Sequence, residues 1–154
     1  MADKSKLGME FPAYTITVEK EKIAEFAVAV SQKDSREQIN PIYCDEGAAK
    51  KAGYQGIPIP PTFPTNTFFW TGGGLMATIK TLGIDLNKLL HREEEYEYFG
   101  SIYAGDVITR KMKVVDILKK GKRNMIMEIT VLESELINQR GELVLKYRTK
   151  LIEK

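Results

Sequence analysis

The stretch from Pro58 to Trp70 constrains the fold of this chain more than any other segment. Its thirteen residues, PIPPTFPTNTFFW, contain four prolines and four large aromatic side chains. The prolines before Thr62 exclude regular helix there, because each fixes its own φ and pushes the preceding residue toward extended geometry. Thr62 is suited to cap a helix, and Pro64 is acceptable in its first turn. Because no charged residue occurs between Thr62 and Lys80, we predict a helix that is apolar nearly all round and therefore buried.

The glycines at 72–74 interrupt this predicted helix, since each glycine costs about 1 kcal/mol relative to alanine in a helix. Residues 75–82 then resume it and end near Gly83. A helix break is the simpler interpretation of the glycines, and the alternative is that they make room for a long ligand beside the helix.

The last third of the chain alternates apolar and polar residues, which predicts β-strands. The predicted strands cover residues 89–99, 106–118, 124–133 and 143–151, with turns at 104–106, 119–123 and 138–141. The basic turn at 119–123 is interpreted as a solvated hairpin tip in preference to a phosphate site. Long strands joined by hairpins form an antiparallel sheet that is apolar on one face only. The predicted class is therefore α+β, with the antiparallel sheet wrapped around the central apolar helix.

The first third supplies one strand and two helices. The pattern predicts a strand at Tyr14–Val18, an amphipathic helix at Glu19–Ser31, a polar loop ending at Asn40-Pro41, and a short helix at Asp45–Ala52 that ends at Gly53. Residues 1–12 are predicted to be a flexible leader, and residues 13–154 a single domain.

The composition excludes several classes of partner. The 154 residues have a net charge of +2, which gives no reason to expect nucleic acid or an anionic membrane surface as a partner. Cys44 is the single cysteine, so no internal disulfide forms, and we expect a reducing, cytoplasmic location. No signal peptide or membrane-spanning stretch is evident. One histidine and one cysteine do not supply a usual metal site.

Three segments carry a resemblance to a known superfamily. They are Asn40-Pro-Ile-Tyr-Cys-Asp-Glu46, Ala52-Gly-Tyr-Gln-Gly-Ile-Pro-Ile-Pro-Pro-Thr-Phe63 and Tyr103-Ala-Gly-Asp-Val-Ile108, with Gly141-Glu-Leu-Val144 in the last hairpin as a further typical feature. In this order they resemble the MaoC-like hydratases and dehydratases, which have the hot-dog fold. The resemblance covers most of residues 14–152 and implies a single hot-dog domain.

The chain departs from that superfamily at the catalytic positions. The (R)-specific enoyl-thioester hydratases carry Gly-Asp-x-Asn-Pro-x-His, in which the Asp and the His act as base and acid. When Asn40-Pro41 is set on that pattern, Gln38 stands at the Asp position and Tyr43 at the His position. Gln38 does not titrate, and the ordinary pKa of Tyr43 is about 10, which is poorly matched to proton transfer at neutral pH. No catalytic residue is therefore assigned, and Gln38, Asn40 and Tyr43 are degenerate positions.

In lacking the Asp and His of this pattern, the chain resembles the N-terminal, non-catalytic half of the FAS1-like dehydratases. The resemblance implies a subunit that binds acyl thioesters for a 3-hydroxyacyl dehydratase or enoyl hydratase, a hydro-lyase of fatty acid metabolism. A homodimer, or a heterodimer with a catalytic hot-dog subunit, is implied as well. No cofactor is implied, because the substrate carries its own CoA or phosphopantetheine arm. An acyl-CoA thioesterase and a non-enzymatic acyl-thioester binding module remain as alternatives.

The resemblance also implies substrate-binding positions. They are Gly56, Ile57, Pro61, Thr62, Phe63 and Trp70. Thr62 stands where the superfamily places a backbone N–H on the thioester carbonyl, and an N–H at a helix start is a suitable oxyanion donor. Phe63 and Trp70 are interpreted first as core residues and second as the lining of an acyl channel.

Other chemically capable residues have simpler interpretations. His91, the only histidine, is expected to be solvated or structural, although its pKa lies nearest neutrality. Asp45 and Glu46 are the first candidates for a thioesterase base, but they are interpreted first as the acidic start of a helix. Cys44 has no histidine nearby in sequence to activate it. The three glutamates 93, 95 and 97 share one strand face, which we predict to face water.

Overall fold

The computed structural model describes residues 4–70, 74–122 and 125–154. Its helices and strands, in chain order, are β1 (Glu10–Thr17), α1 (Lys20–Ser31), α2 (Glu46–Lys51), α3 (Asn66–Trp70), α4 (Gly74–Leu82), β2 (Leu89–Tyr98), β3 (Val107–Lys122), β4 (Met125–Ile137) and β5 (Leu143–Glu153). Short 3-10 turns are η1 (Lys4–Lys6), η2 (Arg36–Gln38), η3 (Pro41–Tyr43), η4 (Phe63–Thr65) and η5 (Leu86–Lys88). The five strands form one antiparallel sheet in the order β1-β3-β4-β5-β2, which confirms the α+β prediction.

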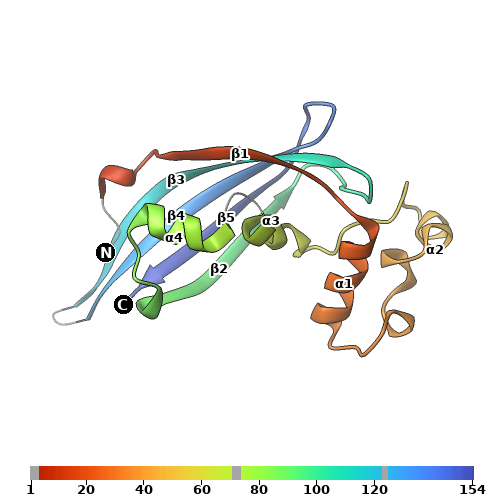
Figure 1. The fold of residues 1–154 in the computed structure, drawn as a ribbon, viewed down its shortest axis with the longest axis horizontal. Helices are drawn as coiled ribbons and strands as arrows, with labels where there is room; N and C mark the ends of the chain where they lie inside the picture. The colour runs from red at the N-terminus through yellow and green to blue at the C-terminus, as the bar shows by residue number, and fades with distance from the viewer. Residues whose placement is uncertain (1–3, 71–73, 123–124) are drawn as a thin grey trace.

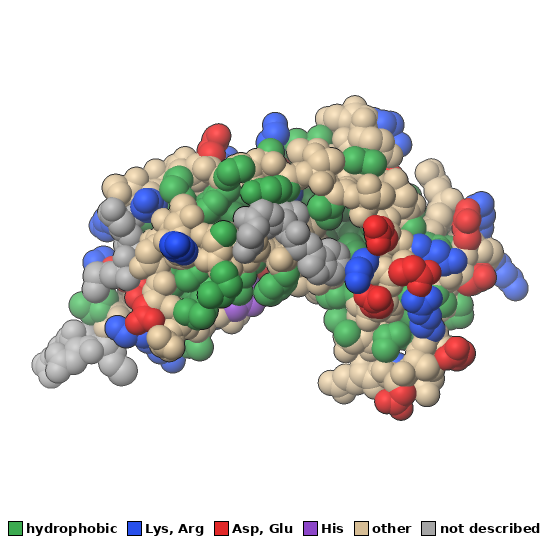
Figure 2. Space-filling model, in the orientation of Figure 1, with side chains coloured by type: hydrophobic (Ala, Val, Ile, Leu, Met, Phe, Trp, Pro, Cys, Tyr) green, Lys and Arg blue, Asp and Glu red, His purple; other side chains and the backbone are tan. Residues whose placement is uncertain are grey.

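Helices α3 and α4 lie across one face of the sheet, here called the inner face (Figure 1). The opposite side is the outer face. Both chain ends lie at one end of the sheet, and α1 and α2 lie at the other (Figure 1). Phe68, Ile79 and Leu82 of the two helices pack against Met112 and Leu132 of the inner face. Charged side chains of both signs gather over the α1–α2 end, whereas apolar side chains are prominent around α4 (Figure 2).

The central helical segment is divided between α3 and α4 near the glycines, as predicted, but it is less buried than predicted. It begins as the 3-10 turn η4, continues as α3, and α4 starts separately at Gly74, whose φ is +67°. Gly72 and Gly73 lie outside the described residues. Phe69 and Met76 are 56% and 57% exposed, so the prediction of a helix buried all round is wrong. The reason is that this single sheet covers the helices from one side only.

Several strand boundaries differ from the predicted ones, and β4 runs on to Ile137, past the predicted end at residue 133. β1 begins at Glu10, inside the segment predicted to be a leader. β3 runs on to Lys122, because Lys119–Lys122 pair with Met125–Glu128 of β4. Most of the predicted basic hairpin tip is therefore strand.

A bulge in β3 changes which residues face the helices. The register with β4 shifts between Val114 and Asp116. Ile117 beyond the bulge joins the inner core, whereas Ile129 and Val131 of β4 form a small buried cluster with Ile152 on the outer face. The prediction of a sheet apolar on one face only is wrong at this end, because Ile129 and Val131 alternate in step with the outward Glu133 and Glu135 along an unbroken β4–β5 register.

No helix within the described ranges is long and apolar enough to cross a membrane.

Candidate functional site

Two of the segments that carry the family resemblance, residues 52–63 and 103–108, meet at the Pro-rich corner, which is defined here as residues 57–63. The Ala104 amide donates to the Ile57 carbonyl (2.9 Å), and the Ile59 amide donates to the Ile102 carbonyl (3.1 Å). This short antiparallel pairing fixes the extended segment before Pro60. Gly56 lies beside it, where an added Cβ would stand 3.8 Å from the Cβ of Tyr103, an ordinary contact.

The chain then turns into η4 and leaves one backbone donor free. The Phe63 amide donates to the Pro60 carbonyl (2.9 Å), and the Tyr98 hydroxyl donates to the Pro61 carbonyl (2.7 Å). Thr62 stands at the N-cap of η4, but its side chain makes no capping hydrogen bond, so the predicted capping role is wrong. Among the described residues, none accepts a hydrogen bond from the Thr62 amide. Thr62 is an exposed residue.

Depressions flank the corner on two sides. One, of about 350 Å³, is lined by Gly56, Ile57, Tyr103 and Ala104 together with Lys20, Glu46 and Gln55. The other, of about 290 Å³, is lined by Phe63 and by residues 16–19 and Lys22. Phe63 itself is only 3% exposed, and its ring meets that of Phe26 edge-on at 5.5 Å. Phe63 is therefore a core residue whose edge reaches the surface depression.

An apolar cavity lies beneath the corner. It is lined by Phe63, Pro64, Thr67 and by Ile16, Val18, Ile59, Ile102, Ile108 and Leu136, and its volume is about 10 Å³. That volume is close to the space of one water molecule. The cavity that the described residues form behind Phe63 is therefore too small to hold an acyl chain. The side chain of Trp70, the other predicted channel residue, lies outside the described residues.

The three degenerate positions lie in the loop between α1 and α2. Gln38 is exposed in η2, where its side chain accepts a hydrogen bond from the Asp34 amide (3.4 Å). The Asn40 side chain accepts from the Ile42 amide (3.2 Å) and starts η3. Tyr43 packs against the core that contains the corner. Of the three, Tyr43 is the one brought toward the corner.

Neither corner tyrosine is adapted for proton transfer. Burial raises the pKa of Tyr43, and the neighbouring Tyr54 adds to the increase. Burial also raises the pKa of Tyr98, with a further contribution from Tyr43. Both phenols are therefore even less able than a free tyrosine to give up a proton at neutral pH.

Sequence reasoning missed a carboxylate close to the helix start. Glu94 Oε2 accepts from the Thr65 hydroxyl (2.6 Å) and from the Tyr96 hydroxyl. Glu94 Oε1 accepts from the Thr149 hydroxyl (3.1 Å) and lies 3.4 Å from His91 Nε2. The alternation that places Glu93 outward also places Glu94 inward, so the signal was present in the sequence. With four such contacts, this carboxylate is a structural anchor for η4.

A second polar anchor holds the next residues of the helix. The Thr67 hydroxyl lies 3.0 Å from the Tyr147 hydroxyl, and Arg110 Nη1 donates to the Thr67 carbonyl (3.0 Å). Arg110 is 3% exposed, and its guanidinium lies over the Phe68 ring at 5.7 Å. Thr65 and Thr67 thus fix the first turn of the central segment to both sides of the inner face.

The remaining candidates have structural partners. Asp45 caps α2 by accepting from the Ala48 amide (2.5 Å), and Glu46 pairs with Lys50 (2.7 Å). Cys44 Sγ has the Pro41 carbonyl as its hydrogen-bond partner (3.7 Å). No group of three or more potential metal-ligating side chains occurs among the residues described. The carboxylates proposed for a thioesterase are therefore engaged in starting a helix.

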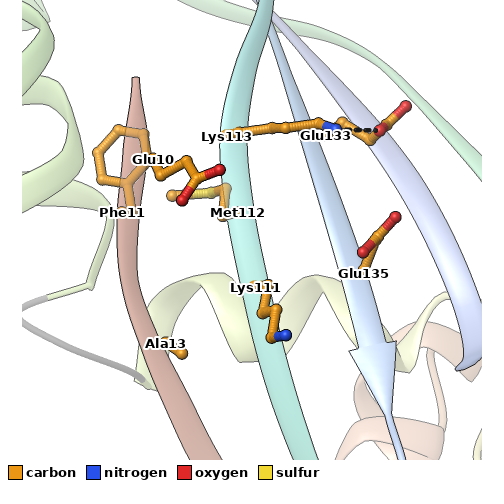
Figure 3. A pocket seen from close by; sticks show the side chains of 8 residues that line it. All are labelled: Glu10, Phe11, Ala13, Lys111, Met112, Lys113, Glu133 and Glu135. Carbon is orange, nitrogen blue, oxygen red and sulfur yellow. Dashed lines mark ion pairs between the residues drawn. The ribbon is translucent and has the colours of Figure 1, made fainter. Parts of the chain in front are cut away.

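Another depression, of about 370 Å³, lies on the outer face, away from the corner. Figure 3 shows its lining from β1, β3 and β4, with Lys113 paired to Glu133 and with Lys111 and Glu135 alongside. None of the predicted site residues lines it, and opposite charges alternate across its floor. We interpret it as a solvated part of the sheet surface.

Comparison with known proteins identifies relatives along most of the chain. The family described as "FAS1-like, dehydratase domain region" matches residues 5–147. A UPF0336 protein of Thermobifida fusca is 34% identical over 131 residues, which cover 85% of this chain and 79% of that protein.

Solved structures of similar fold include dehydratases. A chain of the C-terminally truncated HadBC (3R-hydroxyacyl-ACP dehydratase) complex from Mycobacterium tuberculosis has a TM-score of 0.73 and 23% identity, and the match covers 96% of each chain. A MaoC-like dehydratase has a TM-score of 0.76 and 21% identity, and the match covers 97% of this chain but 42% of that one. At these identities the likeness shows a shared fold.

Proposed function

We infer a function from what is shown: the chain belongs to the family of the FAS1-like dehydratase domain region and has the hot-dog fold. We propose that it is an acyl-thioester-binding subunit. The enzyme it serves would be a 3-hydroxyacyl dehydratase or (R)-specific enoyl hydratase, and the acid–base pair would lie on a partner chain. The substrate brings its own CoA or carrier-protein arm, so the subunit itself needs no cofactor.

The observation that carries the proposal is the free Thr62 amide. Thr62 is an exposed residue of the corner, whose residues Ile57 and Phe63 line two separate depressions, and the neighbouring Phe63 amide is already bonded to Pro60. A thioester carbonyl placed there accepts a hydrogen bond from a fixed backbone donor. Such a donor stabilises the negative charge that develops on the carbonyl oxygen when a proton moves at the adjacent carbon.

Neither of the two positions that the resemblance gives to the base and the acid, Gln38 and Tyr43, carries a group suited to moving that proton. Gln38 has no titratable group, and burial raises the pKa of Tyr43. A positioned acid or base raises the rate of such a reaction about 10²–10⁴-fold. A partner chain that supplies these groups is consistent with the HadBC dehydratase, which is a complex of different chains by its name.

The test is to assay the purified chain for binding and for turnover. Crotonyl-CoA binding is measured by calorimetry and by the NMR shift of the Thr62 amide, and hydration of crotonyl-CoA by absorbance. We expect the Thr62 signal to move on titration and hydration to be absent. Thr62→Pro, which removes the N–H, is expected to abolish binding, whereas Thr62→Val, which keeps it, retains binding; circular dichroism confirms that both variants are folded.

Two results would contradict the proposal. Robust hydration by the isolated chain that survives Gln38→Ala and Tyr43→Phe would show that the catalytic pair is not needed. Unchanged binding by a folded Thr62→Pro variant would show that the Thr62 amide does not bind the thioester. Release of free thiol from acyl-CoA would favour a thioesterase instead, although Asp45 and Glu46 are engaged in starting α2.

A further inference from the structure

The Pro-rich corner contains a tight turn whose middle peptide carries the Thr62 amide. The Phe63 amide donates to the Pro60 carbonyl (2.9 Å), which closes a β-turn with Pro61 and Thr62 at its centre. The dihedral angles of Thr62, φ −103° and ψ 3°, fit the third residue of a type I turn. Proline is favoured at the second position of such a turn, where Pro61 stands. The middle peptide is therefore the Pro61–Thr62 unit.

Turns of this kind have two forms that differ by a flip of the middle peptide. In a type II turn the third residue has a φ of about +80°, and the C=O and N–H of the middle peptide point the opposite way. A positive φ is unfavourable for a β-branched residue such as Thr62. The residue type alone therefore favours the observed orientation, and a second contact adds to it.

That second contact is the hydroxyl of Tyr98. It donates to the Pro61 carbonyl oxygen at 2.7 Å, the usual length of a good O–H···O bond. Tyr98 ends β2, where it pairs with Leu145 of β5, and directly after it the Phe99 amide donates to the Val144 carbonyl (2.9 Å). The donor is thus fixed by the sheet, and the acceptor belongs to the turn.

The bond at the Pro61 oxygen affects the N–H at the other side of the same peptide. The Pro61–Thr62 peptide is trans and planar, with C=O and N–H pointing in opposite directions, so holding the oxygen also holds the N–H. A hydrogen bond at the carbonyl also polarises the amide, by about 10–30% per bond in a hydrogen-bonded chain. Because burial raises the pKa of Tyr98, its hydroxyl keeps its proton at neutral pH and remains a donor.

We propose that Tyr98 is a positioning residue for the thioester site, because its hydroxyl orients the Pro61–Thr62 peptide and strengthens the Thr62 N–H as a donor. This inference rests on the proposed function, in which a thioester carbonyl accepts from that N–H. The carbonyl then lies on the other side of the peptide from the Tyr98 hydroxyl. Tyr98 therefore acts through the peptide and moves no proton.

The first test uses the full chain without a ligand. Tyr98→Phe removes the hydroxyl and keeps the ring. NMR is expected to show the Pro61 carbonyl carbon moving upfield, because it loses a hydrogen bond, and a changed residual dipolar coupling of the Thr62 N–H, because the peptide is held less firmly. The matched control is Tyr54→Phe, which should change neither signal, since Tyr54 is 38% exposed and its hydroxyl has no hydrogen-bond partner within the described part of the chain.

The second test measures the strength of the donor toward a thioester. Crotonyl-CoA with an isotope label at the thioester carbonyl is bound to the chain, and infrared difference spectroscopy gives the C=O stretching frequency, which a hydrogen bond lowers. Tyr98→Phe is expected to weaken binding about 2–10-fold and to reduce this lowering, as the lost polarisation requires. A ring-fluorinated tyrosine at position 98 is a stronger donor and should lower the frequency further, at a pH where it stays protonated.

A change at position 62 separates this role from a merely structural one. Thr62→Gly keeps the N–H and admits a positive φ, so the middle peptide is free to flip once the Tyr98 hydroxyl is absent. We expect Tyr98→Phe to cause at least about a twofold greater loss of crotonyl-CoA binding when position 62 is glycine than when it is threonine. A side chain that only packed against the corner would cause the same loss in both cases.

Three results would overturn the inference. They are a Pro61 carbonyl resonance that Tyr98→Phe leaves in place, a thioester stretching frequency that neither change at Tyr98 alters, and equal losses of binding with threonine and with glycine at position 62. If the unmodified chain binds no crotonyl-CoA, the proposed function fails. The Pro61 resonance and the Thr62 coupling in the free chain then still decide whether Tyr98 holds and polarises the peptide.

Discussion

Neutralising Glu133 tests whether the charged outer face contributes to folding stability. Glu133 lies in the middle of that face, and its side chain is 6% exposed. Arg148 donates from both Nε and Nη2 to its Oε2 at 2.9 Å, and Lys113 and Lys146 lie 3.5 and 4.0 Å from its Oε1. Glu133→Gln keeps the shape of the side chain and removes its charge.

The expected cost follows from these contacts. Hydrogen bonds to a charged group contribute about 1.5–3 kcal/mol, and each looser lysine pair adds up to about 1 kcal/mol. The glutamine oxygen retains part of the Arg148 bonding. Arg148 and Lys113 are about half exposed, so water stabilises their charges once the carboxylate is gone. We therefore expect a loss of about 2 kcal/mol, which lowers the Tm by about 4–8 °C for a chain of this size.

The effect depends on pH in a known direction. Burial alone raises the pKa of Glu133, but the hydrogen bond from Arg148 and the charges of Lys146 and Lys113 outweigh it, so the net pKa lies below the usual value. A lowered folded-state pKa gives stability that is present above the unfolded-state pKa, about 4.3, and is lost as the pH falls through the folded-state value. The difference between the original chain and Glu133→Gln should therefore be full at pH 7 and disappear in acid.

The assay is urea unfolding at fixed protein concentration between pH 7 and pH 3. The matched control is Glu46→Gln, which breaks an exposed helical pair with Lys50 and is expected to cost about 0.3–0.5 kcal/mol. A Glu133→Gln cost no larger than that of the control would refute the reasoning, as would a difference that stays constant down to pH 3.

Two further predictions concern the central segment. Gly74→Ala is expected to lower the free energy of unfolding by at least about 1–2 kcal/mol, because φ at Gly74 is +67° and the new Cβ would lie 2.7 Å from the Phe69 carbonyl oxygen. Urea unfolding measures this loss. An equal loss for Gly100→Ala, where φ is not positive, would contradict the prediction. Glu94→Gln should lower the pKa of Tyr96, which burial raises first and the hydrogen bond to Glu94 raises further. Tyrosinate absorbance during a pH titration checks this, and an unchanged Tyr96 titration would show that the hydrogen bond contributes nothing.

Local patterns were sufficient to predict most of the fold. Helical spacing predicted the first helix as Glu19–Ser31, and α1 covers Lys20–Ser31. Asp45 and Gly53 predicted where α2 starts and ends. In the structure Asp45 caps the helix, and Gly53 follows it with a φ of +95°. These features depend on neighbours within a few residues, so the local sequence is sufficient to predict them.

Features that depend on distant partners were not predicted. The bulge at Val114–Asp116 shows only in the register with β4, and it brings Ile117 to the inner core. Thr62 was assigned a cap from its residue type, whereas Glu94, 29 residues after Thr65, is what anchors η4. The positions of Gly56 and Ile57 at the corner agree with their place in the resembling segment, and their role in binding remains a prediction.

The proline in β1 also limits how far assembly can proceed. A sheet with two receptive edges can add copies without end and grow into a ribbon or fibre. Here one edge carries Pro12 and an irregular register, which leaves β2 as the edge better suited to receive a further strand. A sheet that extends from one edge alone is not expected to grow into a fibre.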